Sequence, residues 1–182
     1  ILVHAAGNDG KENDFENNFP HDKFERRGWF RPKYAETWIE VGAMGASNDQ
    51  DLTAGFSNWS ADKVDVFAPG EEIYATVPDN KYQDLQGTSM AAPMVAGLAA
   101  TLRSYFPDLT AEQVKQIIMD SSVKPSFLVN VPGEEDKQVM LDKLSVTGGV
   151  VNTLRAVQMA MNTQGDKKKP AATRDTALVP RA

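Results

Sequence analysis

Two short stretches of the chain hold residue types that could do hydrolytic chemistry. In "GTSMAAP", Gly87 to Pro93, a serine follows Gly-Thr and opens a run of small apolar residues. In "AAGND", Asn8 follows an apolar run that is typical of a buried strand. A serine hydroxyl can attack a carbonyl carbon, and an asparagine amide can donate a hydrogen bond to the resulting oxyanion. Ser89 and Asn8 are therefore the candidate catalytic residues.

The position of Ser89 at a helix start adds a second donor. Its own backbone N–H belongs to the unpaired donors of the first helical turn, which point toward negative charge. Gly87 lets the backbone approach a ligand closely. The local sequence also fits plainer functions: Thr88 or Ser89 as a helix N-cap, and Asn8 as a turn residue before Asp-Gly. The tripeptide Gly87-Thr88-Ser89, taken alone, favours the interpretation of Thr88 or Ser89 as an N-cap.

The chain reads as strands alternating with helices, which indicates an α/β fold with a mostly parallel sheet and helices on both faces. Pro93 is expected near the first turn of its helix, and Thr110-x-x-Gln113 is a capping box. The last helix is expected to bury Val151, Leu154, Val157 and Met161. The expected strands lie at 1–7, 38–44, 64–70 and 72–78, with a weaker pair at about 127–131 and 139–144. The expected helices lie at 88 to about 106, within 109–122 and within 148–162.

Domain boundaries follow from composition. Residues 1–164 are expected to form one domain, with a polar loop from about 8 to 36 that its aromatic residues Phe15, Phe19, Phe24, Trp29 and Phe30 fold onto the body. The tail 165–182 has no apolar period and is expected to be disordered, and its "LVPR" matches a cleavage site common in expression vectors. The chain opens within a strand, so residues are expected before Ile1.

Charge and composition exclude several classes of function. The net charge is −6 and no basic face is evident, so nucleic acid is not an expected partner. The absence of cysteine excludes a thiolate nucleophile and a Cys-ligated zinc site. No apolar run reaches the roughly 20 residues that cross a bilayer. The aspartates lie in turns without the spacing of a calcium loop, so no metal or cofactor is predicted. Asn58-Trp59-Ser60 matches a glycosylation sequon.

The stretches "HAAGND", "VDVFAPGEEIYAT" and "LQGTSMAAPMVAGLAA" resemble the carboxy-terminal half of subtilisin-like serine proteases, the subtilases. The resemblance runs from Ile1 to about Asn162 and implies a subtilisin-like fold. It implies that Ser89 is the nucleophile and that Asn8 is the side-chain donor of the oxyanion hole. It also implies that Ala6 and Gly7 line the pocket for the residue before the scissile bond. With Gly87 and Thr88, these make the predicted substrate-binding set.

The resemblance also implies what this stretch lacks. The family places its triad in the order Asp, His, Ser, so the acid and base are expected on a segment before Ile1. His4 lies about 13 Å from Asn8 along a strand, too far for proton transfer, and is expected to face the core or the sheet. His21 is expected to be solvated. The expected partners are this amino-terminal segment, which would cover a raw sheet edge, and a peptide or protein substrate.

Three functions remain on sequence grounds. The first is a serine endopeptidase, secreted or in the cell envelope by resemblance, with a calcium site left open because many subtilases bind calcium. The second is a catalytically inactive peptide-binding module, although Ser89 and Asn8 stand where a working oxyanion hole needs them. The third, an unrelated serine hydrolase, is disfavoured because no Gly-x-Ser-x-Gly elbow surrounds Ser89. Met94 replaces a histidine common among relatives, at a position that is structural in the family.

Overall fold

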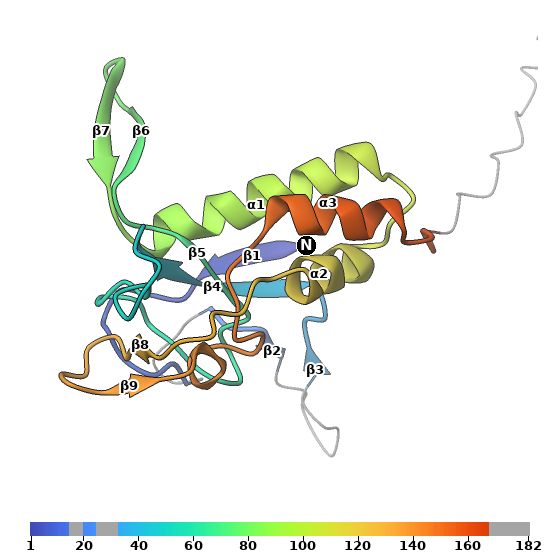
Figure 1. The fold of residues 1–182 in the computed structure, drawn as a ribbon. Helices are drawn as coiled ribbons and strands as arrows, with labels where there is room; N and C mark the ends of the chain where they lie inside the picture. Colours follow the sequence, from blue (N-terminus) through green and yellow to red (C-terminus); the bar gives the residue numbers. More distant parts are fainter. Residues whose placement is uncertain (15–19, 25–32, 168–182) are drawn as a thin grey trace, which may run out of the picture.

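The computed structural model describes residues 1–14, 20–24 and 33–167. At its centre lies a three-stranded parallel sheet in the order β1, β4, β5, with strands Leu2–Ala5, Trp38–Met44 and Val66–Pro69. Figure 1 shows the long helix α1 running across this sheet, and α1 contacts all three strands. The predicted α/β class and parallel pairing are confirmed.

The other elements surround this sheet. The helices are α1 (Thr88–Tyr105), α2 (Ala111–Asp120) and α3 (Thr153–Met161), with one 3-10 turn, η1 (Leu141–Lys143). The antiparallel pairs are β2 with β3 (Lys23–Phe24, Lys33–Tyr34), β6 with β7 (Ile73–Val77, Lys81–Leu85) and β8 with β9 (Val129–Asn130, Gln138–Val139).

The prediction of helices on both faces of the sheet is wrong. Alternate residues of β4, Ile39, Val41 and Ala43, are fully buried in one cluster with residues from all three α-helices. The opposite face is covered by loops, β8, β9 and η1, through a second cluster that includes Trp59, Phe67 and Leu141. These connecting segments carry enough apolar side chains to bury that face without a long helix.

Helix α1 is buried on one side and exposed on the other. Its buried side consists of Ala91, Ala92, Val95, Leu98, Ala99 and Leu102. The other side is exposed, with Met94 at 43% exposure and Gly97 having no atom within 4 Å of an added Cβ. Small apolar residues on nearly every side of 88–106 predict a helix buried in the centre of the domain, and this prediction is wrong for the described residues. Pro93 is the sixth helical residue, beyond the first turn where the sequence placed it.

The two later helices begin as the sequence predicts. At α2 both halves of the capping box form, because Gln113 N–H donates to the Thr110 hydroxyl and Thr110 N–H donates to Gln113 Oε1. The Asn152 side chain caps α3 by accepting from Arg155 N–H. The predicted buried side of α3 is partly wrong: Leu154 and Met161 are 67% and 71% exposed. Its smaller residues Ala156 and Ala160 are buried instead, which lets α3 approach α1 and α2 closely.

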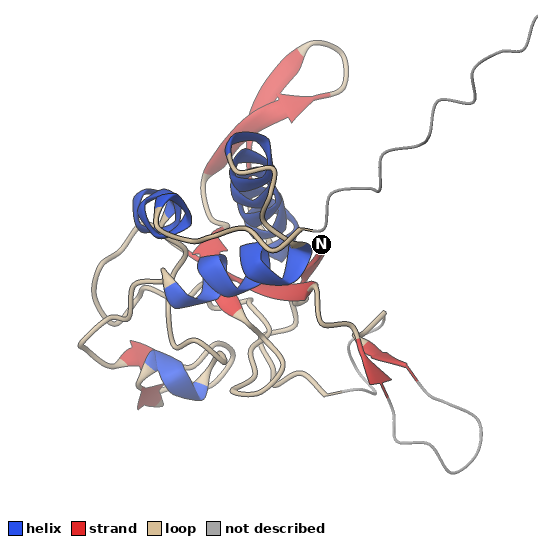
Figure 2. Ribbon diagram, turned by 90° about the vertical axis from the view of Figure 1, so that its right-hand side faces the viewer, coloured by secondary structure: helices blue, strands red, loops and turns tan. Residues whose placement is uncertain are grey.

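Strands β6 and β7 form a hairpin that stands away from the body just before α1 (Figure 2). Its turn places Asp79 and Asn80 at positive φ, the left-handed conformation that is common in tight hairpin turns. The Tyr74 and Tyr82 rings stack on its surface with centroids 5.5 Å apart. The predicted strand at 72–78 is confirmed, but it pairs within this hairpin and not in the parallel sheet.

The ends of the polar segments differ in part from expectation. Gly165, Asp166 and Lys167 lie against α2, since Gln113 Nε2 donates to Asp166 and Lys167 N–H donates to Asp108 O. Residues 168–182 and most of the aromatic loop, with Phe15, Phe19, Trp29 and Phe30, lie outside the described residues.

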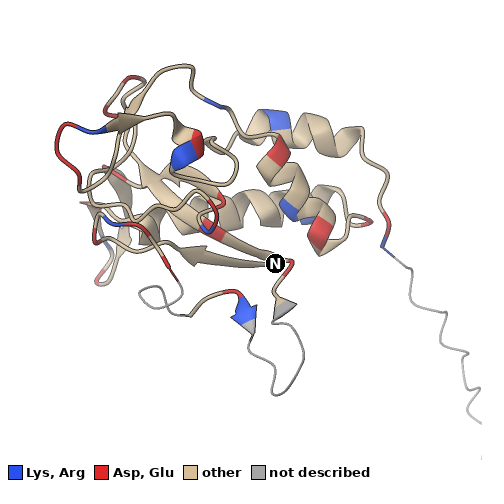
Figure 3. Ribbon diagram, turned by 90° about the horizontal axis from the view of Figure 1, so that it is seen from below, with Lys and Arg blue, Asp and Glu red and all other residues tan. Residues whose placement is uncertain are grey.

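Acidic and basic residues are interspersed around the ribbon (Figure 3). None of the described helices is long and apolar enough to span a bilayer.

Candidate functional site

The ends of the central strands meet the start of helix α1. Gly70, directly after β5, donates its N–H to Met44 O at the end of β4, over 2.8 Å. Gly87 N–H in turn donates to Gly70 O, also over 2.8 Å. Asn8 lies three residues beyond the end of β1. The parallel register therefore brings Asn8 and the first turn of α1 to one edge of the sheet.

Asn8 is fixed to α1 through its side-chain oxygen. Thr88 N–H and the Thr88 hydroxyl both donate to Asn8 Oδ1, over 2.8 and 3.0 Å. Gly7 N–H donates to the same hydroxyl over 3.1 Å. A backbone N–H can only donate, so the amide oxygen must face Thr88 and Asn8 Nδ2 is directed elsewhere as a donor. The predicted closeness of Asn8 to the start of α1 is confirmed.

A small space beside Gly87 lies between two donors. A Cβ on Gly87 would lie 3.4 Å from Asn8 Nδ2 and 3.6 Å from the backbone nitrogen of Ser89. Gly87 itself has φ 143°, which L side chains rarely adopt. An anionic oxygen next to Gly87 would thus lie near two donor nitrogens, one from the turn after β1 and one from the first turn of α1, at the positive end of the helix dipole.

Ser89 is exposed at this edge, and its hydroxyl makes no hydrogen bond to any of the described residues. Gly87 is the N-cap residue of α1 and no side chain caps the helix. The alternative interpretation of Thr88 or Ser89 as a simple N-cap is therefore wrong. Thr88 is the first and Ser89 the second residue of the helix.

The predicted substrate-binding residues differ in accessibility. Ala6 is fully buried, its N–H donates to Val41 O and its carbonyl accepts from Asn13 Nδ2, so it offers no group to a substrate. Thr88 is also fully buried, and its hydroxyl is used by Gly7 and Asn8. Gly7 is partly exposed beside Asn8. Sequence reasoning missed the bond between Thr88 and Asn8; its one signal was a threonine directly before the serine.

The two histidines lie in other surroundings than Ser89. His4 Nδ1 is 2.8 Å from Glu40 Oε1, and its ring lies against Trp38 with centroids 5.0 Å apart. Trp38 Nε1 donates to the other oxygen of Glu40 over 2.7 Å. The expectation that His4 faces the sheet is confirmed. His21 is half-buried, not solvated as the sequence suggested.

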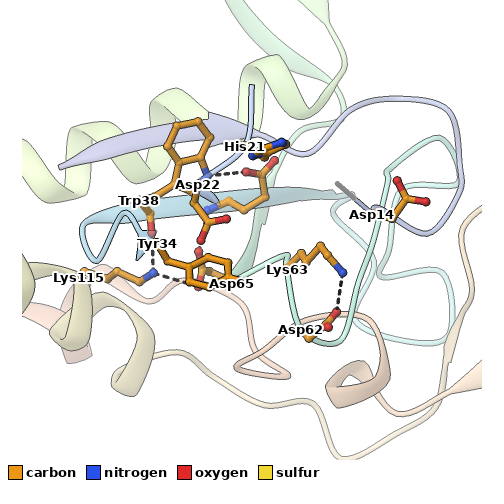
Figure 4. Close-up of a pocket in the computed structure, with 10 residues that line it drawn as sticks. Asp14, His21, Asp22, Tyr34, Trp38, Asp62, Lys63, Asp65 and Lys115 are labelled. Atoms are coloured by element: carbon orange, nitrogen blue, oxygen red, sulfur yellow. Dashed lines mark hydrogen bonds and ion pairs between the residues drawn. The ribbon is translucent and has the colours of Figure 1, made fainter. Parts of the chain in front are cut away.

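His21 lines a charged cavity of about 130 Å³ (Figure 4). Lys115 of α2 reaches across it to Asp65 Oδ1 at 3.3 Å and to Trp38 O, while Asp65 Oδ2 accepts from Glu40 N–H. Burial raises the pKa of the Asp65 carboxyl, against the opposing charge of Lys115. The cavity is lined by Asp14, His21, Asp22, Tyr34, Trp38, Glu40, Asp62, Lys63, Asp65 and Lys115.

The contacts of Lys115 across this charged cavity join α2 to the sheet, and Ser89 is not among the residues that line it. Burial also raises the pKa of Asp22 there. Within the described part of the chain, no group of three or more His, Asp or Glu side chains is arranged to hold a metal ion. No local pattern predicts the pair between Asp65 and Lys115, because the two residues are 50 positions apart.

Comparison with known proteins points to one family. Residues 1–165 match the family model described as Subtilase family, Peptidase S8. Subtilisin DY of Bacillus licheniformis is 37% identical over 115 residues, which is 63% of this chain and 36% of that protein. The thermophilic serine proteinase of Bacillus sp. (strain AK1) is 41% identical over 104 residues, 57% of this chain and 21% of that protein. This chain therefore matches about a third or less of their length.

Solved structures share the fold. The prenylagaramide maturation protease PagA superposes with a TM-score of 0.60 at 28% identity, over 87% of this chain and 50% of that one. The self-cleaved protease domain of PatA superposes with a TM-score of 0.57 at 24% identity, over 88% of this chain and 50% of that one, which shows likeness of fold alone.

Proposed function

Because the chain belongs to the subtilase family, we propose that it carries the nucleophile and the oxyanion hole of a serine endopeptidase. Ser89 attacks the peptide carbonyl, and Asn8 Nδ2 and the Ser89 N–H stabilise the oxyanion. The observation that carries this proposal is the bond from Thr88 N–H to Asn8 Oδ1, because it fixes the oxygen of the amide on Thr88 and leaves Nδ2 as the donor beside Gly87. The exposed position of Ser89 supports it further.

The reaction proceeds in two halves through an acyl-enzyme. A histidine base takes the Ser89 hydroxyl proton as the oxygen bonds to the carbonyl carbon, and the same histidine then protonates the leaving amine. In the second half, water attacks the carbonyl carbon of the acyl-enzyme with the same histidine as base, which releases the acid product and restores the Ser89 hydroxyl. In each half the carbonyl oxygen gains negative charge next to Gly87, between the two donors.

The histidine and its carboxylate partner come from an upstream segment in this proposal. His4 is held by Glu40 within the sheet, which is not an arrangement for proton transfer to Ser89. Two surfaces support the presence of a covering segment. Strand β1 is at the edge of the described sheet, with Leu2 57% exposed, and one side of α1 is exposed around Met94. On the family resemblance we propose that such an enzyme acts outside the cell or in its envelope.

Of the predicted substrate-binding residues, Gly7 and Gly87 keep that proposed role. Gly7 lies next to Asn8 and is partly exposed. Gly87 is itself buried, and it keeps the role because it has no Cβ to fill the space beside Asn8 Nδ2 and the Ser89 nitrogen. Thr88 acts through Asn8 instead, because its N–H and hydroxyl both donate to Asn8 Oδ1. Ala6 is fully buried, and Asn13 and Val41 occupy its backbone groups. The proposed substrate is a peptide or protein.

Active-site labelling tests the proposal. The chain is treated with a fluorophosphonate, alone and joined to an upstream segment that supplies Asp and His, with Ser89→Ala as the matched control. Labelling at Ser89 is expected only in the joined protein and is lost in Ser89→Ala. No labelling of the joined protein would support the inactive peptide-binding module instead, and rapid labelling of the chain alone would contradict the need for an external base.

A further inference from the structure

The turn that carries Asn8 is held from below by two buried asparagines. Asn13 and Asn58 are each 1% exposed, although most asparagines lie on protein surfaces. Asn58 Oδ1 accepts from Asp9 N–H over 2.8 Å and from Lys11 N–H over 3.4 Å. Asn58 therefore holds the backbone directly after Asn8.

The backbone before Asn8 is held by the same pair. Asn58 N–H donates to Gly7 O over 2.9 Å. Asn58 Nδ2 donates to Asn13 Oδ1 over 2.9 Å, and Asn13 Nδ2 donates to Ala6 O over 2.7 Å. Thus the residues on both sides of Asn8 are bonded to one connected pair, which we call the asparagine clamp, Asn13 with Asn58.

The orientation of both amides follows from the chain of bonds. Asp9 N–H can only donate, so the Asn58 atom facing it is the oxygen, and Asn58 Nδ2 then faces Asn13. Asn13 must accept with its oxygen and is left with its nitrogen toward the Ala6 carbonyl. Only one arrangement satisfies every bond, and a buried network in which each amide oxygen and nitrogen has a partner favours a single local conformation.

The backbone around Asn8 leaves little freedom to compensate for a lost clamp. Gly7 has φ 105°, and a Cβ there would lie 2.5 Å from Asn58 Nδ2. The turn therefore passes so close to Asn58 that only glycine fits between them. The same burial disfavours Asn58 as a glycan acceptor, because the residue is 1% exposed and its Nδ2 is bonded to Asn13.

We propose that Asn13 and Asn58 are positioning residues that fix Asn8 for the oxyanion. This inference rests on the proposed function. Asn8 reaches α1 only through its side chain, so the placement of Nδ2 depends on where the backbone of residues 6–11 is held. An oxyanion donor must be placed to within a few tenths of an ångström, and a displaced donor loses rate, not substrate affinity.

Kinetics in the joined enzyme test this role. Asn58→Ala is expected to lower kcat roughly tenfold, a fraction of the loss for an absent donor, with KM changed less than about twofold. In an Asn8→Ala background the same substitution should have no further effect on kcat, because the donor that it positions is gone. Asn152→Ala, which removes a helix cap remote from the site, is the matched control and should leave kcat unchanged. Equal kcat losses from Asn58→Ala in both backgrounds would overturn the proposal.

Amide exchange gives a readout that does not need activity. In the 182-residue chain, Asn58→Ala should speed exchange of the Thr88 N–H by roughly tenfold or more, because that bond reports the placement of Asn8. The Val95 N–H in the same helix should be unchanged. Asn13→Ala, which keeps the Asn58 bonds to Asp9 and Lys11, serves if Asn58→Ala does not fold, and should speed Thr88 exchange to a smaller degree. Unchanged Thr88 exchange in a folded clamp variant would overturn the clamp even if the enzyme proved active. If the joined wild-type enzyme is inactive while Thr88 exchange responds, the proposed function fails and the clamp stands.

Discussion

Gly87→Ala perturbs the space between the two donors most directly. Gly87 has φ 143° and ψ 161°, a region that is nearly restricted to glycine and costs other residues about 1–3 kcal/mol. Its new methyl would lie in contact with Asn8 Nδ2 and the Ser89 nitrogen, at 3.4 and 3.6 Å. The substitution should therefore reduce the free energy of unfolding by about 1–3 kcal/mol.

The same methyl should exclude the oxyanion. If the account is right, kcat of the joined enzyme falls by about 10²–10³, the range reported for subtilisin when its own side-chain donor is removed. Urea unfolding measures the stability term and ester hydrolysis measures kcat. Gly55→Ala is the matched control, because it has no atom within 4 Å of its added Cβ and no positive φ, and both quantities should stay near wild type. A Gly87→Ala enzyme with near-normal kcat would refute the placement of the oxyanion beside Gly87.

Three further predictions concern the supports of the site and the core. Thr88→Val should lower stability by about 1 kcal/mol in urea unfolding and lower kcat less than Asn8→Ala does, since Gly7 N–H loses its acceptor while Thr88 N–H still holds Asn8; wild-type stability would contradict the bond. Thr110→Ala should cost about 1 kcal/mol by the same measurement, because the capping box of α2 is lost, and an unchanged midpoint would argue against the cap. Because the pKa of Asp65 is raised in the folded state, its favourable contribution to stability is full below the unfolded value of 3.8 and is lost as pH rises through the folded pKa. Asp65→Asn lacks this loss. The unfolding free energy of wild type should therefore fall relative to that of the variant as pH rises from about 3 to 7. A pH-independent difference would contradict it.

Local sequence patterns predicted the secondary-structure elements, and the wrong predictions concern how those elements pack against one another. The strand at Trp38–Met44 and the capping box at Thr110 follow from contiguous residues, so both are confirmed. The buried side of α3 was mispredicted because Leu154 and Met161 are large and apolar, whereas close helix packing selected Ala156 and Ala160. The sequence cannot show how near another helix will come.

The site divides in the same way. Asn8 and Ser89 each stand at a recognisable junction of strand, turn and helix, and parallel pairing brings such junctions together. The supports could not be predicted, since the bonds from Thr88 to Asn8 and from Asn58 to Asp9 join residues 80 and 49 positions apart. The role of Ala6 was an implication of the family resemblance, and the sequence could not show that Asn13 and Val41 occupy both of its backbone groups.

The proposed oxyanion hole requires that Asn8 Nδ2 and the Ser89 N–H share one anionic oxygen. A crystal structure of the joined enzyme modified at Ser89 by a fluorophosphonate tests this directly. We predict a phosphonyl oxygen beside Gly87, about 2.7–3.1 Å from both nitrogens. A phosphonyl oxygen directed to solvent, or bonded to neither donor, would contradict the claim.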